Sequence, residues 1–285
     1  MQVEINGNTL EVEVLGDNPQ VPVMIVHHGA PGLGSHREPK ASFGPLSDEY
    51  RIVVFDARGS GVSEGKPPFT HEQWAGDVEG LRQWIGAETI IMAGGSYGGF
   101  IAMEYTIRYP DRVSALILRD TSADNQHRAA ARANALSSAR IEVDHDKFER
   151  MMEGRIRDNE DFEDCWRHIL PLYDHTFDPE KTEEKARTTP YRFATHNFAF
   201  SVNQKNYDIK DRLPAIRCPT LVTVGRHDWI TPVAASETIA RLIPGAQLVV
   251  FEESGHSPQI EEAPKFQATV RAFLSEALSH RRAAE

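Results

Sequence analysis

The chain has 285 residues, of which 40% are hydrophobic and 26% are charged, and its formal net charge at pH 7 is −11. This length suits one large α/β domain or one domain with an insertion, and the composition is that of an ordinary soluble globular protein. Because the balance is acidic and no basic stripe stands out, the sequence argues against nucleic acid and anionic membrane surfaces as partners. A diffuse negative charge mildly favours cationic substrates.

Neither a targeting segment nor a membrane span is visible in the sequence. The first residues alternate apolar and polar side chains, and no apolar run approaches the roughly 20 residues of a membrane span. Cys165 and Cys218 lie far apart and outside any C-x-x-C motif. They are typical of reduced thiols in a cytoplasmic protein, and a disulfide between them is the alternative.

Apolar patterning predicts an alternation of strands and helices. Residues 3–5 and 10–15 alternate around Asn6-Gly7-Asn8, which predicts an N-terminal hairpin. Continuous apolar runs predict buried parallel strands at 21–26, 52–55, 89–93 and 113–118, and a helix that starts with a Thr70–Gln73 capping box precedes the third run. This alternation implies a mostly parallel sheet covered by helices on both faces.

The alternation stops after Asp120. Residues 122–207 contain amphipathic helices and no convincing strand, whereas strand-like runs return at 220–224 and 248–251. We therefore expect an α/β core formed by residues 1–121 and 208–285, with an inserted all-helical cap formed by residues 122–207.

The most informative motif is G-x-S-x-G at residues 94–98, which lies between a β-branched run and an amphipathic helix. This strand–turn–helix context is what a nucleophile elbow requires. The glycines keep Cβ atoms out of a tight turn where strand and helix pack closely. Ser96 is therefore the predicted nucleophile, and a small residue in a tight turn is the alternative reading.

An acid and a base follow later strands. Catalytic groups of an open parallel sheet collect beyond the carboxyl ends of its strands, and Asp228 and His256 follow the last two strand-like runs. The order Ser, Asp, His is that of the α/β-hydrolase triad. We expect His256 to take the proton of Ser96 and Asp228 to orient the imidazole. Asp120 is the rival acid and His227 the rival base.

Two backbone N–H groups are needed to stabilise a developing oxyanion. Tyr97, directly after the serine, is expected to supply one, and Ala30, in a glycine-rich loop, the other. His28 is expected either to hold that loop by hydrogen bonds or to contact the substrate. His27, His28 and His36 lie close in sequence, but without a carboxylate partner they are weak evidence for zinc.

Five segments together resemble the motif set of the proline iminopeptidase-like α/β-hydrolases. They are HGAPG at 28–32, DARGSGVS at 56–63, GGSYGG at 94–99, GRHD at 225–228 and SGHSP at 254–258. The resemblance implies the α/β-hydrolase fold with a helical cap. It also implies an acyl-enzyme on Ser96, a small-molecule substrate, and neither a metal nor an organic cofactor.

The resemblance is weaker where the substrate would bind. Family members that trim N-terminal proline have glycine at the position of Ala30 and use cap glutamates to hold the free α-amine, whereas residues 190–207 here contain no acidic residue. Because an unpaired ammonium in an apolar pocket is costly, we expect a hydrolase of a small ester, lactone or amide. Asp174 or Glu153 could replace those glutamates, so an N-terminal prolyl aminopeptidase is the alternative.

Two further expectations concern the cap and the scaffold. Phe193 and Phe198 suggest an apolar acyl pocket, unless they simply form the core of the cap. A non-catalytic small-molecule binding protein on the same scaffold is the third hypothesis for the function.

Overall fold

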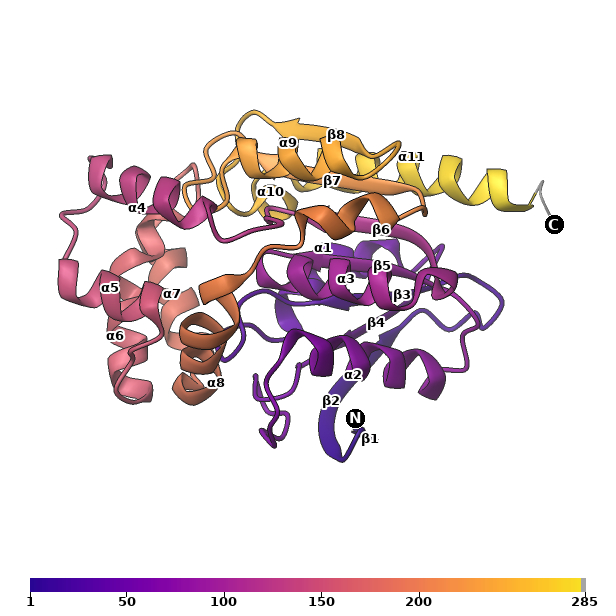
Figure 1. Ribbon diagram of the computed structural model, residues 1–285, viewed down its shortest axis with the longest axis horizontal. Coiled ribbons are helices and arrows are strands. Elements are labelled where there is room, and N and C mark those ends of the chain that lie inside the picture. Colours follow the sequence, from indigo (N-terminus) through magenta and orange to yellow (C-terminus); the bar gives the residue numbers. More distant parts are fainter. Residues whose placement is uncertain (283–285) are drawn as a thin grey trace.

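Eight strands form one sheet at the centre of the protein (Figure 1). The computed structural model describes residues 1–282, and the strand order is β1-β2-β4-β3-β5-β6-β7-β8. The strands are β1 (Gln2–Ile5), β2 (Asn8–Leu15), β3 (Val23–His27), β4 (Arg51–Phe55), β5 (Ile90–Gly95), β6 (Val113–Arg119), β7 (Thr220–Gly225) and β8 (Gln247–Phe251). β1 and β2 pair antiparallel, whereas β3 to β8 pair in parallel. The predicted, mostly parallel sheet is confirmed.

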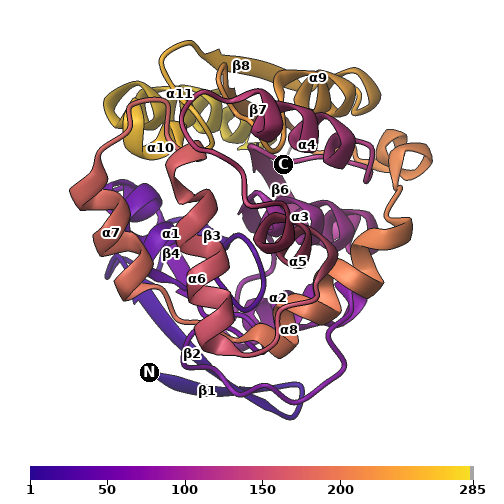
Figure 2. The ribbon, with the colours of Figure 1, turned by 90° about the vertical axis from the view of Figure 1, so that its left-hand side faces the viewer.

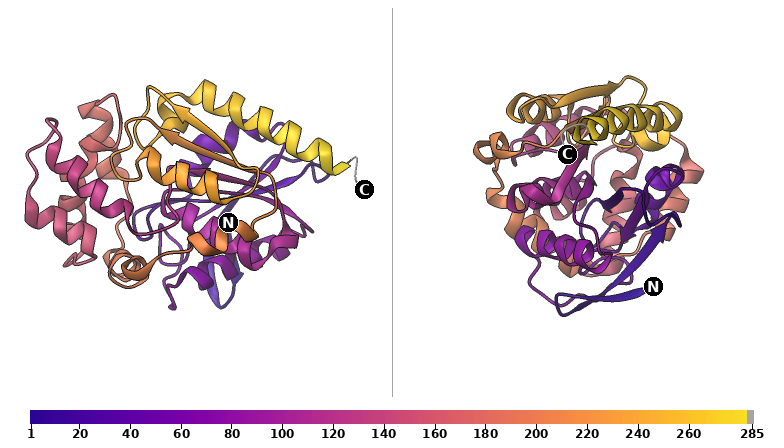
Figure 3. Two further views of the ribbon diagram at one scale, coloured as in Figure 1. Left: turned by 45° about the horizontal axis from the view of Figure 1, so that its top comes forward. Right: turned by 90° about the vertical axis from the view of Figure 1, so that its right-hand side faces the viewer.

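Helices cover both faces of the sheet and extend beyond one end of it. They are α1 (Arg37–Phe43), α2 (His71–Trp84), α3 (Tyr97–Arg108), α4 (His127–Ser137), α5 (His145–Glu153), α6 (Asn159–Ile169), α7 (Pro179–Thr188), α8 (Phe193–Phe198), α9 (Val233–Leu242), α10 (Pro258–Glu261) and α11 (Ala263–Arg282). α1 and α11 pack on one face, and α2, α3 and α9 pack on the other (Figure 3). The predicted α/β-hydrolase fold class, a parallel sheet between two helical layers, is confirmed.

The N-terminal hairpin turns on two residues. Asn6 has a φ of 50° and Gly7 a φ of 72°, with Ile5 paired to Asn8. Two successive positive φ values define a type I′ turn, for which Asn-Gly is a favoured pair. The predicted hairpin is confirmed, although β2 starts at Asn8 and not at residue 10.

β3, the first parallel strand, was predicted at residues 21–26 but runs from Val23 to His27. β3 begins at Val23 because Pro22 has no N–H to donate to the ladder. It continues to His27, which pairs with Gly94 of β5. This pairing brings the loop after β3 next to the serine turn.

Each face of the sheet buries its own apolar cluster. On one face, α2 contributes Trp74, Val78 and Leu81, all essentially inaccessible to solvent. On the other, α11 contributes Phe266 and Val270, which are equally buried. Burying one side chain of this size contributes about 1.5–3 kcal/mol, so the two layers hold the strands, and the loops at their ends, in fixed positions.

At the start of α2, one of the two hydrogen bonds of the predicted capping box is replaced by another contact. Thr70 Oγ1 accepts a hydrogen bond from Gln73 N at 3.2 Å, as expected of an N-cap. The Gln73 side chain does not reach back to Thr70, and its Nε2 donates instead to Asp77 Oδ1 at 3.0 Å. Asp77 is itself the partner of the buried Arg58, at 2.8 Å.

The chain between β6 and β7 forms α4 to α8, which gather beyond the carboxyl ends of the strands (Figure 2). Their apolar cluster includes Phe148, Phe162 and Trp166, joined by Trp229 from the loop after β7. The helices lie directly on the strand-end loops, because a Cβ added to Gly32 would come within 2.9 Å of the backbone of α8. We refer to these helices below as the cap.

Two smaller expectations concern the thiols and the membrane. Cys165 is buried, Cys218 is partly buried, and both are free thiols. No helix assigned within residues 1–282 combines the length and the apolar composition that crossing a membrane demands.

Candidate active site

Ser96 sits at the turn between β5 and α3 in a strained backbone conformation. Its φ is 53° and its ψ is −125°, a region that residues other than glycine occupy only when the surrounding structure imposes it. The close packing of β5, α3 and the end of β3 imposes it here, and the flanking glycines make that packing possible. A Cβ on Gly94 would lie 2.5 Å from Gly98 C, and a Cβ on Gly98 would lie 2.5 Å from His27 O. Ser96 is partly exposed, whereas the residues on both sides of it are buried.

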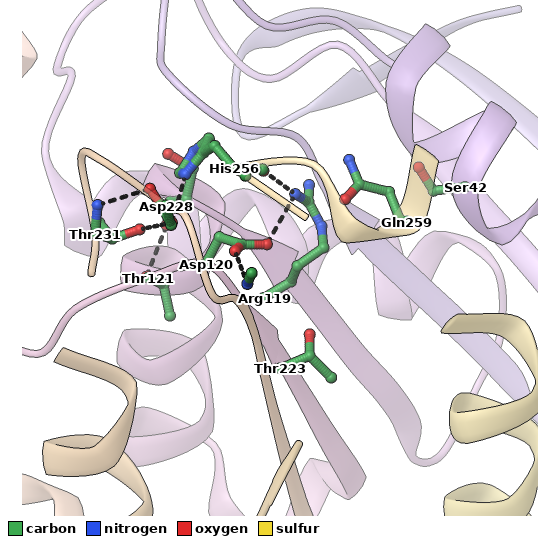
Figure 4. Close-up of polar contacts among 12 residues, drawn as sticks. Ser42, Arg119, Asp120, Thr121, Thr223, Asp228, Thr231, His256 and Gln259 are labelled. Atoms are coloured by element: carbon green, nitrogen blue, oxygen red, sulfur yellow. Dashed lines mark hydrogen bonds and ion pairs between the residues drawn. The ribbon is translucent and has the colours of Figure 1, made fainter. Parts of the chain in front are cut away.

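Asp228 and His256 meet in a direct hydrogen bond. His256 Nδ1 lies 2.8 Å from Asp228 Oδ2 (Figure 4). The loops after β7 and β8 are pressed together at this point, since a Cβ on Gly225 would lie 2.5 Å from Ser254 O. The predicted acid and base are therefore brought together by the contact of two strand-end loops.

Further donors fix the Asp228 carboxylate. Oδ1 accepts from Ile230 N at 2.9 Å and from Thr231 N at 3.0 Å, and Oδ2 also accepts from Thr231 Oγ1 at 2.7 Å. Burial would raise the pKa of Asp228, but His256 and these hydrogen bonds outweigh it and hold that pKa below its usual value. The carboxylate is thus kept ionised beside the imidazole.

The charge of Asp228 acts back on His256. Burial would lower the pKa of His256, but the Asp228 carboxylate, with a further contribution from Asp120, raises it above the usual value, while Arg119 opposes this. A base with a raised pKa holds a proton more readily, which is what a group that must accept and return one needs.

Asp120, the rival acid, lies beside the pair without binding the imidazole. Its φ is 46°, and its Oδ1 accepts from Gly225 N at 2.9 Å. Burial, together with the neighbouring Asp228 charge, raises the pKa of Asp120 to about 7. The hydrogen bond to His256 Nδ1 therefore belongs to Asp228, and Asp120 is a third buried acid close to it.

Asp120, Asp228 and His256 also form a group whose potential metal-ligand atoms lie within 4.8 Å of one another. The nitrogen offered by His256 is Nδ1 or Nε2, and Nδ1 is already at hydrogen-bond distance from Asp228. Both oxygens of Asp228 accept from N–H or O–H donors of the protein. We interpret the group as an acid–base cluster. The loop residues His27, His28 and His36 form no such group within the described residues.

His227, the rival base, faces away from this cluster. It is exposed, and its ring stacks on that of His175 with centroids 3.8 Å apart and an angle of 12° between the planes. Both rings line a separate cavity that does not include Ser96. The geometry therefore leaves His256 as the histidine next to the acid.

Ser96 and His256 line the same cavity, of about 240 Å³. Within the described residues, no hydrogen bond joins Ser96 Oγ to His256. In substrate-free enzymes such bonds are often long and tighten only in the complex. The structure therefore places Ser96 and His256 on the wall of the same cavity.

Of the two predicted oxyanion donors, Tyr97 follows Ser96 directly in the chain and Ala30 belongs to the loop after β3. Tyr97 is the first residue of α3, and in the part of the chain that is described neither its N–H nor that of Ala30 donates to another protein group. A Cβ on Gly29 would lie 3.6 Å from Ser96 Cβ, so the loop passes close to the serine. The loop folds back on itself through Ala30 O, which accepts from Gly34 N at 2.7 Å.

His28 lies in the wall of the cavity, but its ring nitrogens are used by the protein. Nε2 accepts from Ala57 N at 3.0 Å, and Nδ1 donates to Gly29 O at 3.0 Å. Burial, as the main cause, lowers the pKa of His28, which keeps the ring neutral. These contacts favour the loop-holding role over hydrogen bonding to a substrate. His36 Nδ1 is likewise bound, at 2.7 Å from Asp56 Oδ1.

The contacts of Phe193 and Phe198 favour the alternative in which these residues form part of the core of the cap. Neither residue lines the cavity, because α8 turns Thr195 and His196 toward the core. Phe193 packs into the apolar cluster of the cap, and Phe198 packs on Phe69 with ring centroids 6.1 Å apart. The cap aromatic residues on the wall are Trp166 of α6 and Tyr173 of the turn that follows.

The charged residues of the wall were not among the residues predicted from the sequence. They are Arg37, Glu38, Arg119 and Lys185. Arg119 ends β6, so the same rule that selected residues following the strands could have selected it. Its guanidinium lies over Gly95, next to the serine. Lys185, in α7, has no equivalent signal because its position depends on how the cap packs.

Comparisons with known proteins agree with the fold. A family model described as the alpha/beta hydrolase fold matches residues 22–263. The chain is similar to proline iminopeptidase PfmaB of Pestalotiopsis fici, with 35% identity over 280 residues that cover 95% of this chain and 98% of that protein. It is also similar to 2-hydroxymuconate semialdehyde hydrolase of Pseudomonas putida, with 29% identity over 90% of this chain and 88% of that protein.

Two solved structures superimpose on this chain over almost its whole length. A thermophilic esterase from Thermogutta terrifontis with bound malate superimposes with a TM-score of 0.76 and 29% identity, covering 97% of this chain and 99% of the esterase. The enol-lactonase from Burkholderia xenovorans LB400 superimposes with a TM-score of 0.77 and 24% identity, covering 96% and 100% of the two chains. The second likeness concerns the fold alone.

Proposed function

Since this chain belongs to the α/β-hydrolase fold family and is a proline iminopeptidase-like member of it, we propose that it is a serine hydrolase. Its substrate would be a small ester, lactone or amide, cleaved through an acyl-enzyme on Ser96. The observation that carries the proposal is the 2.8 Å His256–Asp228 hydrogen bond on the wall of the cavity that contains the strained Ser96. The similarity to an esterase supports this substrate class.

The first half-reaction forms the acyl-enzyme. Ser96 Oγ attacks the carbonyl carbon while His256 takes the hydroxyl proton, and Asp228 stabilises the resulting imidazolium through Nδ1–H. The N–H groups of Ala30 and Tyr97 bind the oxyanion. His256 then returns the proton to the oxygen or nitrogen of the leaving group. In the second half-reaction His256 deprotonates a water molecule, which attacks the acyl carbonyl and releases the carboxylic acid and free Ser96.

An N-terminal prolyl aminopeptidase is the second candidate, and the name of the relative with 35% identity favours it. That reaction needs an acidic partner for the substrate's α-amine. Glu153 is engaged by Arg128 at 2.8 Å, and Asp174 lines the separate cavity beside His227. Glu38 is left on the wall of the Ser96 cavity, and it already pairs with Arg119 at 3.1 Å. These contacts favour the first candidate.

A fluorophosphonate probe tests the role of Ser96. We expect the probe to label the wild-type protein and not Ser96→Ala, with p-nitrophenyl ester hydrolysis lost in parallel. A variant that is still labelled would show that another residue is the nucleophile. An unlabelled, inactive wild-type protein would favour the third hypothesis, a non-catalytic binding protein.

Comparing prolyl-β-naphthylamide with short p-nitrophenyl esters separates the two enzymatic candidates, since a dominant rate on the free-amine substrate would reverse their order.

The free thiols of Cys165 and Cys218 support a cytoplasmic location.

A further inference from the structure

The wall of the Ser96 cavity is positively charged, although the chain as a whole is acidic. Its charged side chains are Arg37, Glu38, Arg119 and Lys185. Three cations therefore face one carboxylate, in a chain whose net charge is −11. The sign is opposite to that expected from composition, which favoured cationic substrates.

The inner pair of this wall is internally balanced. Glu38 Oε1 accepts from Arg119 Nη2 at 3.1 Å, Gln259 Nε2 at 2.9 Å and Ser42 Oγ at 2.7 Å. Arg119 is buried and also donates to His256 O at 3.3 Å. The carboxylate of Glu38 is thus already compensated, and an ammonium placed beside it would also meet the Arg119 guanidinium.

The outer pair of cations has no carboxylate partner. Among the residues that the structure describes, neither Arg37 nor Lys185 lies within 4.0 Å of an acidic group. Both lie in one part of the cavity wall, which we call the rim. Arg37 Nη1 reaches Thr188 O at the end of α7 at 3.5 Å, and Lys185 lies one turn earlier in the same helix.

Lys185 is also held toward the cavity. Its Nζ lies 5.7 Å from the ring centroid of Tyr173, which lines the same wall and is packed against His256 with ring centroids 5.4 Å apart. A cation over an aromatic face is attracted to it, so this contact favours one position of a side chain that would otherwise be free in solvent.

We propose that the substrate carries a carboxylate remote from the scissile carbonyl, and that Arg37 and Lys185 bind it at the rim while the carbonyl lies at Ser96. This inference rests on the proposed serine hydrolase and specifies its substrate class. An acid-bearing ester or lactone fits the wall, and a free-amine substrate does not, because two unpaired cations would repel it.

Three p-nitrophenyl esters of equal acyl length test the proposal: the monoester of adipic acid, the neutral hexanoate and the cationic ω-aminohexanoate. For the wild-type protein we expect kcat/KM to fall in that order, with at least a tenfold difference between the anionic and cationic esters. The anionic preference should decrease as salt is added, because ions screen charges at the rim.

Substitutions locate the preference. In Lys185→Gln we expect the ratio of kcat/KM for the adipate monoester to that for the hexanoate to fall about fivefold, the size typical of one partly exposed charge pair. Arg37→Gln should act in the same direction. Lys205→Gln, which removes an exposed charge away from the cavity wall, is the matched control and should leave the ratio unchanged.

The outcomes separate the two proposals. If the hexanoate is hydrolysed in a Ser96-dependent way but the cationic ester is equal or preferred, the carboxylate proposal is overturned while the serine hydrolase stands. If Lys205→Gln lowers the ratio as much as Lys185→Gln does, the effect is long-range and the rim site is also overturned. If no ester is hydrolysed and Ser96 is not labelled, both proposals fail.

Discussion

The loops at the strand ends and the cap wall above them are held by different kinds of contact. At the strand ends backbone presses on backbone: a Cβ on Gly98 would lie 2.5 Å from His27 O, and one on Gly225 would lie 2.5 Å from Ser254 O. The cap also touches these loops through its backbone, since Tyr173 O accepts from His256 N at 2.7 Å, but it presents the ends of side chains to the cavity, such as those of Trp166 and Lys185. The first kind of contact admits one residue type at each position, whereas the second tolerates many.

This difference teaches why reaction chemistry and substrate choice are separable in such a molecule. The proposed nucleophile, acid and base follow strands β5, β7 and β8, whose positions are set by the buried sheet. The side chains that would meet the rest of the substrate come largely from α1 and the loop before it, and from α6 and α7. Substitutions in the strand-end loops are expected to abolish turnover, and those in the cap to redirect it.

The largest expected effect is at the acid. In Asp228→Asn the side chain can no longer accept the Nδ1–H of His256 as an anion, so the imidazole loses its orientation and the imidazolium its counter-charge. We expect kcat to fall by about 10⁴ with the fold intact, measured by ester hydrolysis and by thermal unfolding of both proteins.

Asp120→Asn is the matched control for that substitution, because Asn can still accept the hydrogen bond from Gly225 N. We expect most of kcat to remain. Since the Asp120 charge helps to raise the pKa of His256, its removal should lower that pKa, so the acid limb of kcat/KM should move to lower pH. A 10⁴-fold loss in Asp120→Asn instead would make it the orienting acid.

The second effect concerns backbone contacts. In Gly98→Ala the new Cβ meets the carbonyl oxygens of His27 and His28, which belong to the sheet and its loop and cannot move aside. We expect the free energy of unfolding, from urea denaturation, to fall by about 3 kcal/mol. The remaining folded protein should also lose activity, because the serine turn would shift.

Gly76→Ala provides the contrast. Its Cβ would lie 3.9 Å from Asn6 Nδ2 on the interior of α2, which is ordinary van der Waals contact. Alanine in a helix interior is favoured over glycine, so we expect a gain of about 0.5–1 kcal/mol. Equal losses in the two variants would mean that the tight turn is not the cause.

The contrast between the two regions also explains what could be predicted from the sequence. Ser96, Asp228 and His256 follow strands and occupy glycine-lined loops. Spacing and local pattern were therefore enough to predict that all three lie at one edge of the sheet. Local pattern could not decide between Asp228 and Asp120, because that depends on the contact of the loops after β7 and β8.

In the cap, local pattern failed. Phe193 and Phe198 have a spacing that suits a pocket, but the side of α8 that faces the core is set by the close approach of Gly32 and Gly59 to that helix, a long-range contact. Arg37 and Lys185 are 148 positions apart in the printed numbering and meet at the rim only through the packing of α7 near α1. Composition gives the net charge of the whole chain, so it could not indicate the local excess of cations on this wall.

The smallest expected effect tests the cap wall directly. Trp166 lines the cavity and Phe198 does not, so the two aromatic residues should differ in their influence on the substrate. Trp166→Phe removes roughly 40 Å² of apolar surface, worth about 1 kcal/mol of burial, and we expect KM for the hexanoate ester to rise about fivefold with kcat nearly unchanged. Phe198→Ala should lower the unfolding temperature, because the contact with Phe69 is lost, and leave KM as it is. A KM that responds to Phe198 and not to Trp166 would restore the aromatic pocket that the sequence suggested and would mean that α8, not α6, forms the wall that the substrate meets.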